Sequence, residues 1–244
     1  MAFSGKVALI TGGSKGIGRA AAEQLAAQGA RVAINYSSDS KAADEVVAAL
    51  GGSEKVLAIK ADAGSMSDVK AMVEQTVAKF GKIDILVPNA GLMPLANLEA
   101  LTEELWDQMN AVNVKGPLFL AKAAVPHMPS GSHIIFISTS LCHSSTVMPM
   151  HLPYCANKGA IEQMTRILSK DLAPKGIIVN AVAPGPTETE LFMRGKPDAL
   201  VEAIKKQSPF NRLGAPSEIA ESIVYLAGTT WVSGQTLRCN GSMV

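Results

Sequence analysis

Short runs of apolar, β-branched residues alternate with longer helical stretches from one end of this chain to the other. Such an alternation is typical of βαβ units that stack around a parallel sheet. Because most of the short runs are apolar on both faces, we expect helices to cover both sides of the sheet. The predicted strands are Lys6–Thr11, Arg31–Tyr36, Lys55–Lys60, Ile83–Val87, His133–Thr139, Ile177–Ala181 and Thr236–Asn240.

Stretches with the residue spacing of a helix lie between these strands, and the longest of them is expected to break near Asn113. Crossovers between parallel neighbours are almost always right-handed, so the order of elements predicts a doubly wound Rossmann fold. The expected class is α/β, with a seven-stranded parallel sheet and helices on both faces. The predicted helices are Gly16–Gln28, Ser40–Leu50, Met66–Phe80, Thr102–Met128, Tyr154–Leu172 and Ser217–Ala227.

The chain contains no internal repeat, low-complexity tract or linker, so we expect a single domain over residues 1–244. One segment differs from the rest. Five of the 13 prolines fall between Pro184 and Pro216, where the regular alternation is interrupted. Long irregular insertions in compact domains are usually lids or binding loops, which predicts a substrate loop at about residues 184–216.

The composition excludes several kinds of partner. The chain is 48% hydrophobic and 18% charged, with 22 Lys and Arg against 21 Asp and Glu. A net charge of +1 creates no field strong enough to gather nucleic acid or anionic lipid, so neither is an expected partner. The apolar run near the N-terminus is too short for a membrane span, and the three scattered cysteines suit a reducing compartment. We therefore expect a cytoplasmic protein.

A glycine-rich turn follows the first predicted strand directly and opens into a stretch of strong helix formers. Glycine permits positive φ and a close approach of the backbone to a ligand. The N-terminus of the next helix offers free N–H groups and a positive dipole end to a pyrophosphate. At this strand-to-helix junction the pattern predicts a dinucleotide site rather than a plain turn. The residues expected to hold the dinucleotide here are Gly12, Ser14, Lys15, Gly16, Ile17 and Gly18.

The end of the second predicted strand indicates which dinucleotide is bound. An Asp or Glu there would hydrogen-bond the ribose 2′-hydroxyl of NAD, but the chain has Asn35, Tyr36 and Ser37 instead. No carboxylate is expected to repel a 2′-phosphate, and Lys15 can supply a positive charge close to it. The sequence therefore favours NADP(H). If Lys15 is merely solvated, either cofactor would be accepted.

Tyr154 and Lys158 form the most informative pair in the chain. They are four residues apart at the start of a predicted helix and therefore project from one of its faces. A free tyrosine has a pKa of about 10, and an adjacent ammonium favours the phenolate and lowers that value. We therefore expect Tyr154 to act as a general acid and base near neutral pH, tuned by Lys158.

Five separated motifs together resemble the short-chain dehydrogenase/reductase family over the whole chain. The pattern is most similar to fungal polyhydroxynaphthalene reductases, and members of the family commonly form homotetramers or homodimers. The motifs occur in the order and spacing of that family. They are Thr11-Gly12-x-x-x-Gly16-x-Gly18, Asn89-Ala90-Gly91, Asn113, Tyr154-x-x-x-Lys158 and Pro184-Gly185.

The resemblance implies a role for each matching residue. In the family, the match of Tyr154 gives or takes the substrate proton, and the match of Lys158 binds the nicotinamide ribose. The match of Asn113 holds a water molecule of the proton relay. Asp62 and Ala63 stand where the family holds the adenine ring. The other cofactor contacts that the resemblance implies are Asn89, Ala90, Gly91, Pro184, Gly185, Thr187 and Thr189.

Three hydroxyl groups at the end of the fifth predicted strand are candidates for polarising the substrate: Ser138, Thr139 and Ser140. Counting forward along the strand points to Thr139. Counting back from Tyr154, with the spacing of the polyhydroxynaphthalene reductases, points to Ser140. We predict Ser140, because the distance to the tyrosine constrains the active site more directly.

The chain departs from the family pattern in three places. Pro88 stands where the family usually has an asparagine, Asn240-Gly241-Ser242 stands where Asp-Gly-Gly is common, and the connection at Gly228–Trp231 looks shortened. In the loop before Tyr154, His143 and His151 either face the substrate or are solvated loop residues. No spacing of histidines or cysteines predicts a metal site.

These expectations describe an NADPH-dependent reductase that acts on a small-molecule ketone, which the resemblance implies is apolar or aromatic. Hydride transfer to the ketone carbon would be accompanied by protonation from Tyr154, with Ser140 stabilising the developing charge. Two alternatives stay open. The same residues would serve an alcohol or steroid dehydrogenase that works in the oxidative direction, or the fold would bind a dinucleotide as a sensor without catalysis.

Overall fold

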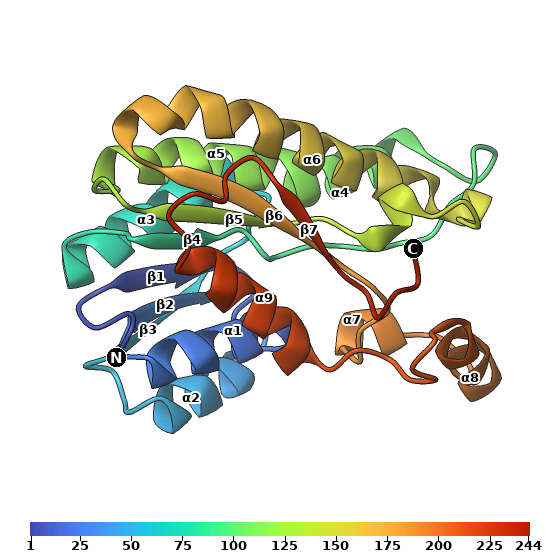
Figure 1. Cartoon of the computed structure of the whole chain (residues 1–244), viewed down its shortest axis with the longest axis horizontal. Coiled ribbons are helices and arrows are strands. Elements are labelled where there is room, and N and C mark those ends of the chain that lie inside the picture. The colour runs from blue at the N-terminus through green and yellow to red at the C-terminus, as the bar shows by residue number, and fades with distance from the viewer.

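The computed structural model describes residues 1–244 and contains one parallel sheet of seven strands (Figure 1). The strands lie in the order β3-β2-β1-β4-β5-β6-β7, so the direction of winding reverses between β1 and β4. The expected α/β fold class is confirmed. The strands are β1 Val7–Ile10, β2 Arg31–Tyr36, β3 Val56–Lys60, β4 Ile85–Val87, β5 His133–Ile137, β6 Ile178–Pro184 and β7 Thr236–Cys239.

Nine α-helices connect or follow these strands. They are α1 Gly16–Ala27, α2 Ser40–Ala49, α3 Met66–Phe80, α4 Glu103–Asn110, α5 Gly116–Ala124, α6 Leu152–Leu172, α7 Glu190–Met193, α8 Asp198–Gln207 and α9 Pro216–Ala227. Helices α3, α5 and α6 pack on one face of the sheet, and α1, α2 and α9 pack on the other (Figure 1). None of the helices combines the length and the apolar composition that crossing a bilayer requires.

Alternate residues of the central strands enter two separate hydrophobic cores. In β1, Val7 and Leu9 point into the core beneath α3, α5 and α6, whereas Ala8 and Ile10 point into the core beneath α1 and α9. All four side chains are fully buried. A strand that is apolar on both faces loses its contact with water only between two helical layers, which explains the continuous apolar runs in the sequence.

The long helical stretch breaks near Asn113, as predicted. Helix α4 ends at Asn110, a π-helical turn covers Ala111–Lys115, and α5 begins at Gly116. Pro117 lacks the backbone N–H that would donate to the carbonyl of Asn113 in a regular α-helix. The carbonyl of Asn113 is thereby released from the helical ladder. Single π turns of this kind are frequent at functional sites.

The segment at residues 184–216 is more regular than the sequence suggested. It contains α7 and α8, which stand apart from the sheet beyond the carboxyl end of β6 (Figure 1). Two of its five prolines mark helix starts, since Pro197 directly precedes α8 and Pro216 is the first residue of α9. A bridge between Thr187 and Gly214 closes the base of the segment.

Candidate dinucleotide cleft and active site

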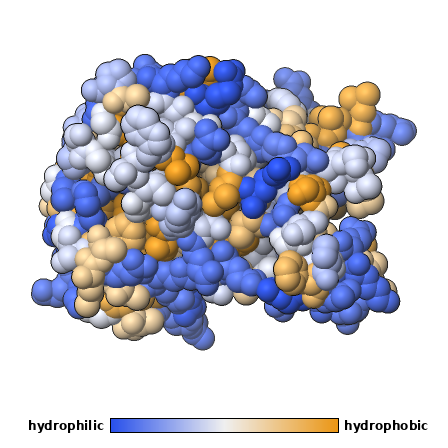
Figure 2. All heavy atoms as spheres, viewed as in Figure 1, coloured by the Kyte–Doolittle hydropathy of each residue, from blue (hydrophilic) through white to orange (hydrophobic).

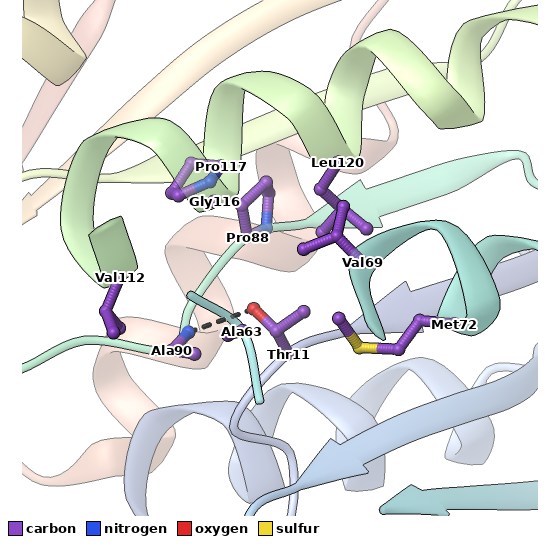
Figure 3. A pocket seen from close by; sticks show the side chains of 10 residues that line it. All are labelled: Thr11, Ala63, Val69, Met72, Pro88, Ala90, Val112, Gly116, Pro117 and Leu120. Atoms are coloured by element: carbon purple, nitrogen blue, oxygen red, sulfur yellow. Dashed lines mark hydrogen bonds between the residues drawn. The ribbon is translucent and has the colours of Figure 1, made fainter. Parts of the chain in front are cut away.

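Many of the predicted site residues lie at the carboxyl ends of the strands, beside the point where the strand order reverses. Open α/β sheets bind ligands in the crevice at this place. Thr11 follows β1, Ala63 follows β3 and Ala90 follows β4, and all three line one small cavity together with Val112 of the π turn (Figure 3). The cavity has a volume of about 10 Å³, which is room for about one water molecule. Ala63 and Ala90, which were expected to contact different parts of a dinucleotide, therefore lie beside each other here.

The glycine turn adopts the conformation for which glycine is required. Gly12 and Gly16 have φ angles of +61° and +52°, which other residues rarely adopt. A Cβ on Gly18 would lie 2.3 Å from the carbonyl oxygen of Gly12 and 2.6 Å from Nδ2 of Asn89. Lys15 is the N-cap residue of α1, and no side chain caps this helix. The first N–H groups of α1 are thus not taken by a capping side chain, as a phosphate site requires.

Thr11 and Asn89 hold the glycine turn against the end of β4. The Thr11 hydroxyl accepts hydrogen bonds from the N–H groups of Asn89 at 2.9 Å and of Ala90 at 3.0 Å, and the latter bond is drawn in Figure 3. Asn89 Nδ2 donates to the carbonyls of Thr11 at 2.9 Å and Gly12 at 3.2 Å. Pro88 lines the neighbouring cavity, so its ring stands where the family has an amide. At the end of β4, Asn89 therefore provides the amide contacts to the turn.

Asn35 occupies a different place from the one expected at the cofactor ribose. Its side chain is only 2% exposed, and its Oδ1 accepts from the N–H of Gly12 at 3.2 Å. Its Nδ2 donates to the carbonyl of Ala61 at 2.7 Å. Because these bonds tie the glycine turn to the chain after β3, Asn35 positions the turn and has no free group to offer a ribose. Beyond it, Tyr36 is half-buried and Ser37 is exposed.

Lys15 is engaged by two carboxylates. Its Nζ lies 2.8 Å from Asp39 Oδ2 and 2.8 Å from Glu190 Oε2. The hydrogen bonds to Asp39 and then Glu190 raise the pKa of Lys15, and the same contact lowers the pKa of Asp39. The end of β2 itself has no carboxylate, as predicted, but Asp39 two residues after Ser37 places one beside Lys15. Asp39 is the N-cap residue of α2: its Oδ1 accepts from the N–H of Ala42 at 3.0 Å, and its Oδ2 is the atom that contacts Lys15.

The remaining predicted cofactor residues surround the same region. A Cβ on Gly16 would come within 3.2 Å of Thr189 Cγ2, so the start of α7 lies against the glycine turn. Thr187 is buried, and its hydroxyl donates to the carbonyl of Gly185 at 2.9 Å. Asp62 is exposed, and its Oδ1 accepts from the N–H of Gly64 at 2.8 Å. Asp62 therefore shapes the turn after β3.

Tyr154 and Lys158 share one face of the first turns of α6, as their spacing predicts. Lys158 Nζ donates to the carbonyl of Ile137 at 2.7 Å and lies 5.8 Å from the centre of the Tyr154 ring. Lys158 is 4% exposed, and this burial lowers its pKa to about 8. At neutral pH the ammonium is mostly protonated, and it is held between the end of β5 and the phenol ring.

Burial raises the pKa of Tyr154, whereas the sequence led us to expect a lowered value. The ammonium of Lys158 is directed at the Ile137 carbonyl, so the loss of water around the phenol outweighs its attraction. A hydrogen bond with the Thr139 hydroxyl opposes the rise only in part. The phenol of Tyr154 is therefore protonated at neutral pH and can donate a proton without first acquiring one.

The three hydroxyls after β5 have different partners. Ser138 donates to Glu162 Oε1 of α6 at 2.7 Å, which removes it from the candidates for substrate contact. Ser140 is buried at the start of a short 3₁₀ turn. Of the three, only Thr139 is close enough to the Tyr154 phenol to lower the pKa of that phenol. The count along the strand, rather than the count back from the tyrosine, thus agrees with this geometry.

The side chain of Asn113 fixes the loop after β4. Its Oδ1 accepts from the N–H of Leu92 at 2.8 Å, and its Nδ2 donates to the carbonyl of Leu92 at 2.9 Å. Its Nδ2 also donates to Asn157 Oδ1 at 3.4 Å. The side-chain amide of Asn113 is thus occupied, and its backbone carbonyl lacks the α-helical donor that a residue other than Pro117 would supply.

Glu162, which no motif in the sequence singles out, holds the loop before Tyr154. Its Oε1 accepts from Ser138 and lies 3.0 Å from Nε2 of His143. Its position four residues after Lys158, on the same helical face, is the signal that could have indicated it. His151 is half-buried, and this burial lowers its pKa. No group of three His, Cys, Asp or Glu side chains in the structure could hold a metal ion.

Comparisons with known proteins agree with this geometry. A family model described as Enoyl-(Acyl carrier protein) reductase matches residues 12–243. A short-chain type dehydrogenase/reductase of Picea abies is 37% identical over 99% of this chain and 93% of its own length. A tetrahydroxynaphthalene reductase of Pestalotiopsis fici is 35% identical over 99% of this chain and 92% of its own length.

Solved structures extend the likeness to three dimensions. A short-chain dehydrogenase from Burkholderia cenocepacia in complex with NADP has a TM-score of 0.93 and 32% identity, covering 100% of this chain and 99% of its own. A blue fluorescent protein from a metagenomic library, in complex with NADPH, has a TM-score of 0.93 and 32% identity, with 100% of both chains covered. Together with the motifs and the fold, these matches show that the chain belongs to the short-chain dehydrogenase/reductase family of oxidoreductases.

Proposed function

We propose that this protein is an NADPH-dependent carbonyl reductase, which reduces a small-molecule ketone while Tyr154 protonates the carbonyl oxygen. The observation that carries the proposal is the half-buried Tyr154, whose phenol has a raised pKa and lies beside Thr139 and Lys158. Reduction of a ketone requires an acid at the oxygen, and a protonated phenol is that acid. The relatives named as reductases support the same direction.

The cleft has the chemistry that NADP(H) needs. The uncapped start of α1 and the glycines of the turn suit the pyrophosphate, and Ala63 and Ala90 line the apolar cavity beside it. When bound, NADPH supplies the hydride. The contact of Thr189 with Gly16 and the ion pair between Lys15 and Glu190 connect α7 to the turn, and we therefore regard residues 184–216 as the lid of this site.

The residues around Tyr154 have separate roles in polarising the carbonyl, delivering the proton and returning a proton to the phenol. Thr139 donates a hydrogen bond to the carbonyl oxygen as negative charge develops there, and Tyr154 delivers the proton. The ammonium of Lys158 and a water molecule at the backbone carbonyl of Asn113 return a proton to the phenol. Each of these groups acts at the same edge of the sheet, beside the cofactor cleft.

The proposal is tested by mixing the pure protein with a panel of activated aromatic and quinonoid ketones, with NADPH and NADH side by side. We expect NADPH oxidation that depends on the ketone and is faster than with NADH. An enzyme of the oxidative direction would instead oxidise secondary alcohols with NADP⁺ more efficiently at neutral pH, which a protonated Tyr154 disfavours. NADPH binding without turnover of any ketone or alcohol would indicate a sensor and refute the proposal.

Replacing Thr139 by valine should lower kcat/KM for the ketone by about 10²-fold, because one polarising hydrogen bond to the developing oxyanion is lost. Thr139→Ser keeps the hydroxyl and should retain most of the activity. Ser140→Ala should change kcat/KM by less than about threefold, within the range of an ordinary buried hydroxyl. The losses of kcat/KM in the three variants, measured by steady-state kinetics, show which of the two hydroxyls contributes more to catalysis. A larger loss for Ser140→Ala than for Thr139→Val would assign the role to Ser140.

The rate of ketone reduction should fall as pH rises through about 8, where Lys158 loses its proton. Below this pH the ammonium is present, and above it the proton relay lacks its cation. Because kcat/KM for NADPH reports groups of the free enzyme, the decrease near pH 8, here called the alkaline limb, should appear in the pH profile of kcat/KM. In Lys158→Arg the limb near 8 should vanish, since a guanidinium stays protonated to about pH 12. An unchanged limb in Lys158→Arg would disprove the assignment.

Replacing Asp39 by asparagine should improve the use of NADPH. Asp39 competes with a 2′-phosphate for Lys15, so its neutralisation should lower KM for NADPH by up to about fivefold and leave KM for NADH unchanged. Asp44→Asn is a matched control, because Asp44 is an exposed acid of the same helix. Equal effects on both cofactors, or an equal effect of Asp44→Asn, would contradict a direct role of Asp39 at Lys15.

A further inference from the structure

Two cysteines meet beside the active site, although they are far apart in sequence. Cys142 Sγ donates a hydrogen bond to the carbonyl oxygen of Cys155 at 3.6 Å, and the two thiols are close enough to shift each other's pKa. Both are free and half-buried. The third cysteine, Cys239 of β7, makes its contact with the carbonyl of Glu218 instead. The chain therefore carries one close pair of thiols and one separate thiol.

The two thiols of the pair differ in acidity. The hydrogen bond from Cys142 lowers the pKa of Cys155. Cys155 also lies in the first turn of α6, where the helix dipole favours a thiolate. The same contact and burial raise the pKa of Cys142. Cys155 is thus the nucleophile of the pair, and Cys142 is positioned to resolve a disulfide formed on it.

Each cysteine is attached to a part of the catalytic apparatus. Cys155 directly follows Tyr154, and Cys142 lies three residues after Thr139 in the same 3₁₀ turn that Thr139 caps. The chain between them is exposed from Ser145 to Met150, so it can adjust when the two ends are drawn together. A bond between the sulfurs would therefore act on the relative position of the phenol and the polarising hydroxyl.

We propose that Cys142 and Cys155 form a modification site that a small organic disulfide of the glutathione type oxidises, with loss of catalytic activity. The Cys155 thiolate attacks one sulfur of the disulfide, breaks its S–S bond and releases one thiol, which takes up a proton. Cys142 then loses its proton, attacks the sulfur of Cys155 in the mixed disulfide and releases the second thiol. Two electrons and two protons pass from the cysteine pair to the disulfide.

The inactivation follows from geometry. A disulfide brings two sulfurs to about 2.05 Å, which is much closer than hydrogen-bonded thiols lie. Cys155 and Cys142 must therefore approach each other, and the adjoining Tyr154 and Thr139 must move with them. A displacement of about 1 Å in a catalytic group can lower the rate by about 10²-fold. We expect oxidation to lower kcat by roughly 10- to 100-fold and a dithiol reductant to restore it.

The full-length protein is incubated with oxidised glutathione, and thiol titration, peptide mapping and ketone reduction are followed together. The proposal predicts that free thiols fall from three to one, that a Cys142–Cys155 cross-linked peptide appears and that dithiothreitol reverses both. Cys142→Ser and Cys155→Ser should each keep their basal activity, form no intramolecular cross-link and lose less activity with oxidised glutathione than the wild type does. Cys239→Ser should behave as the wild type.

Several outcomes would overturn the inference. These are three free thiols after excess oxidant, a cross-link that involves Cys239, full activity of the cross-linked protein, or the same reversible loss of activity in Cys142→Ser as in the wild type. The loss of activity rests on the proposed ketone reduction, but the cross-link does not. A reduced protein that shows no turnover yet forms the cross-link would therefore refute the proposed function without removing the dithiol site.

Discussion

Replacing Tyr154 by phenylalanine should lower kcat for ketone reduction by about 10²- to 10⁴-fold and leave the affinity for NADPH nearly unchanged. The variant keeps the ring that packs beneath Lys158 and removes only the hydroxyl that donates the proton. No other acid described at this site can replace it, since Lys158 is directed at the carbonyl of Ile137 and Ser138 at Glu162. Single-turnover kinetics and a fluorescence titration with NADPH measure the two quantities separately.

Tyr225 provides a matched control for this experiment. It lies on α9, on the face of the sheet opposite α6, and is 58% exposed. Tyr225→Phe should leave both kcat and the affinity for NADPH unchanged, because no substrate or cofactor group is expected near it. If Tyr154→Phe retains more than about a tenth of the wild-type rate, proton transfer from this phenol is not the basis of catalysis.

Replacing Gly18 by alanine should weaken NADPH binding by at least roughly 30-fold, which corresponds to about 2 kcal/mol. The added methyl group would lie 2.3 Å from the Gly12 carbonyl oxygen and 2.6 Å from Asn89 Nδ2. Both atoms belong to the turn that faces the pyrophosphate, so relief of the clash moves the turn itself. Overpacking of this kind also costs about 1–3 kcal/mol of stability, so Tm should fall by roughly 2–10 °C.

Gly159 is the matched control for the glycine exchange. It lies inside α6, and a Cβ there would meet no atom within 4 Å. Alanine is favoured over glycine in a helix by about 1 kcal/mol, so Gly159→Ala should raise Tm. Calorimetry should therefore show a lower Tm for Gly18→Ala and a higher Tm for Gly159→Ala. NADPH titration should show weaker binding for Gly18→Ala and unchanged binding for the control. If Gly18→Ala binds NADPH as the wild type does, the close approach at this turn is not needed for the cofactor.

Element boundaries were predicted well where the pattern is local. Strand β2 and helix α3 begin and end at the predicted residues, because β-branched alternation and a serine cap mark them. Strand β4 is shorter than predicted and begins at Ile85. Asp84 departs from the strand pattern because its buried carboxylate accepts hydrogen bonds from the Val7 N–H and from Lys6 and Lys82. A carboxylate that binds a distant strand leaves no signal in its own neighbourhood.

In the candidate site, too, features encoded within one element were predictable and contacts between distant segments were not. The spacing of Tyr154 and Lys158 lies within one helix, so periodicity alone brings the two side chains to one face. The raised pKa of Tyr154 depends on burial beneath β5 and the loop before α6. The partners of Lys15 come from two elements that lie 24 and 175 residues further along the chain. No pattern within a short window contains these contacts.

The order of strands and helices, the glycine turn and the shared face of Tyr154 and Lys158 could all be deduced from the amino-acid sequence, because each is encoded by residues within one or two helical turns of one another. The tertiary structure decided the charge states and the partners: a protonated phenol at Tyr154, a carboxylate at Lys15, the hydroxyl of Thr139 at the phenol, and a thiol pair at Cys142 and Cys155. Desolvation and hydrogen bonding between remote segments set these properties, and both exist only once the layers have packed.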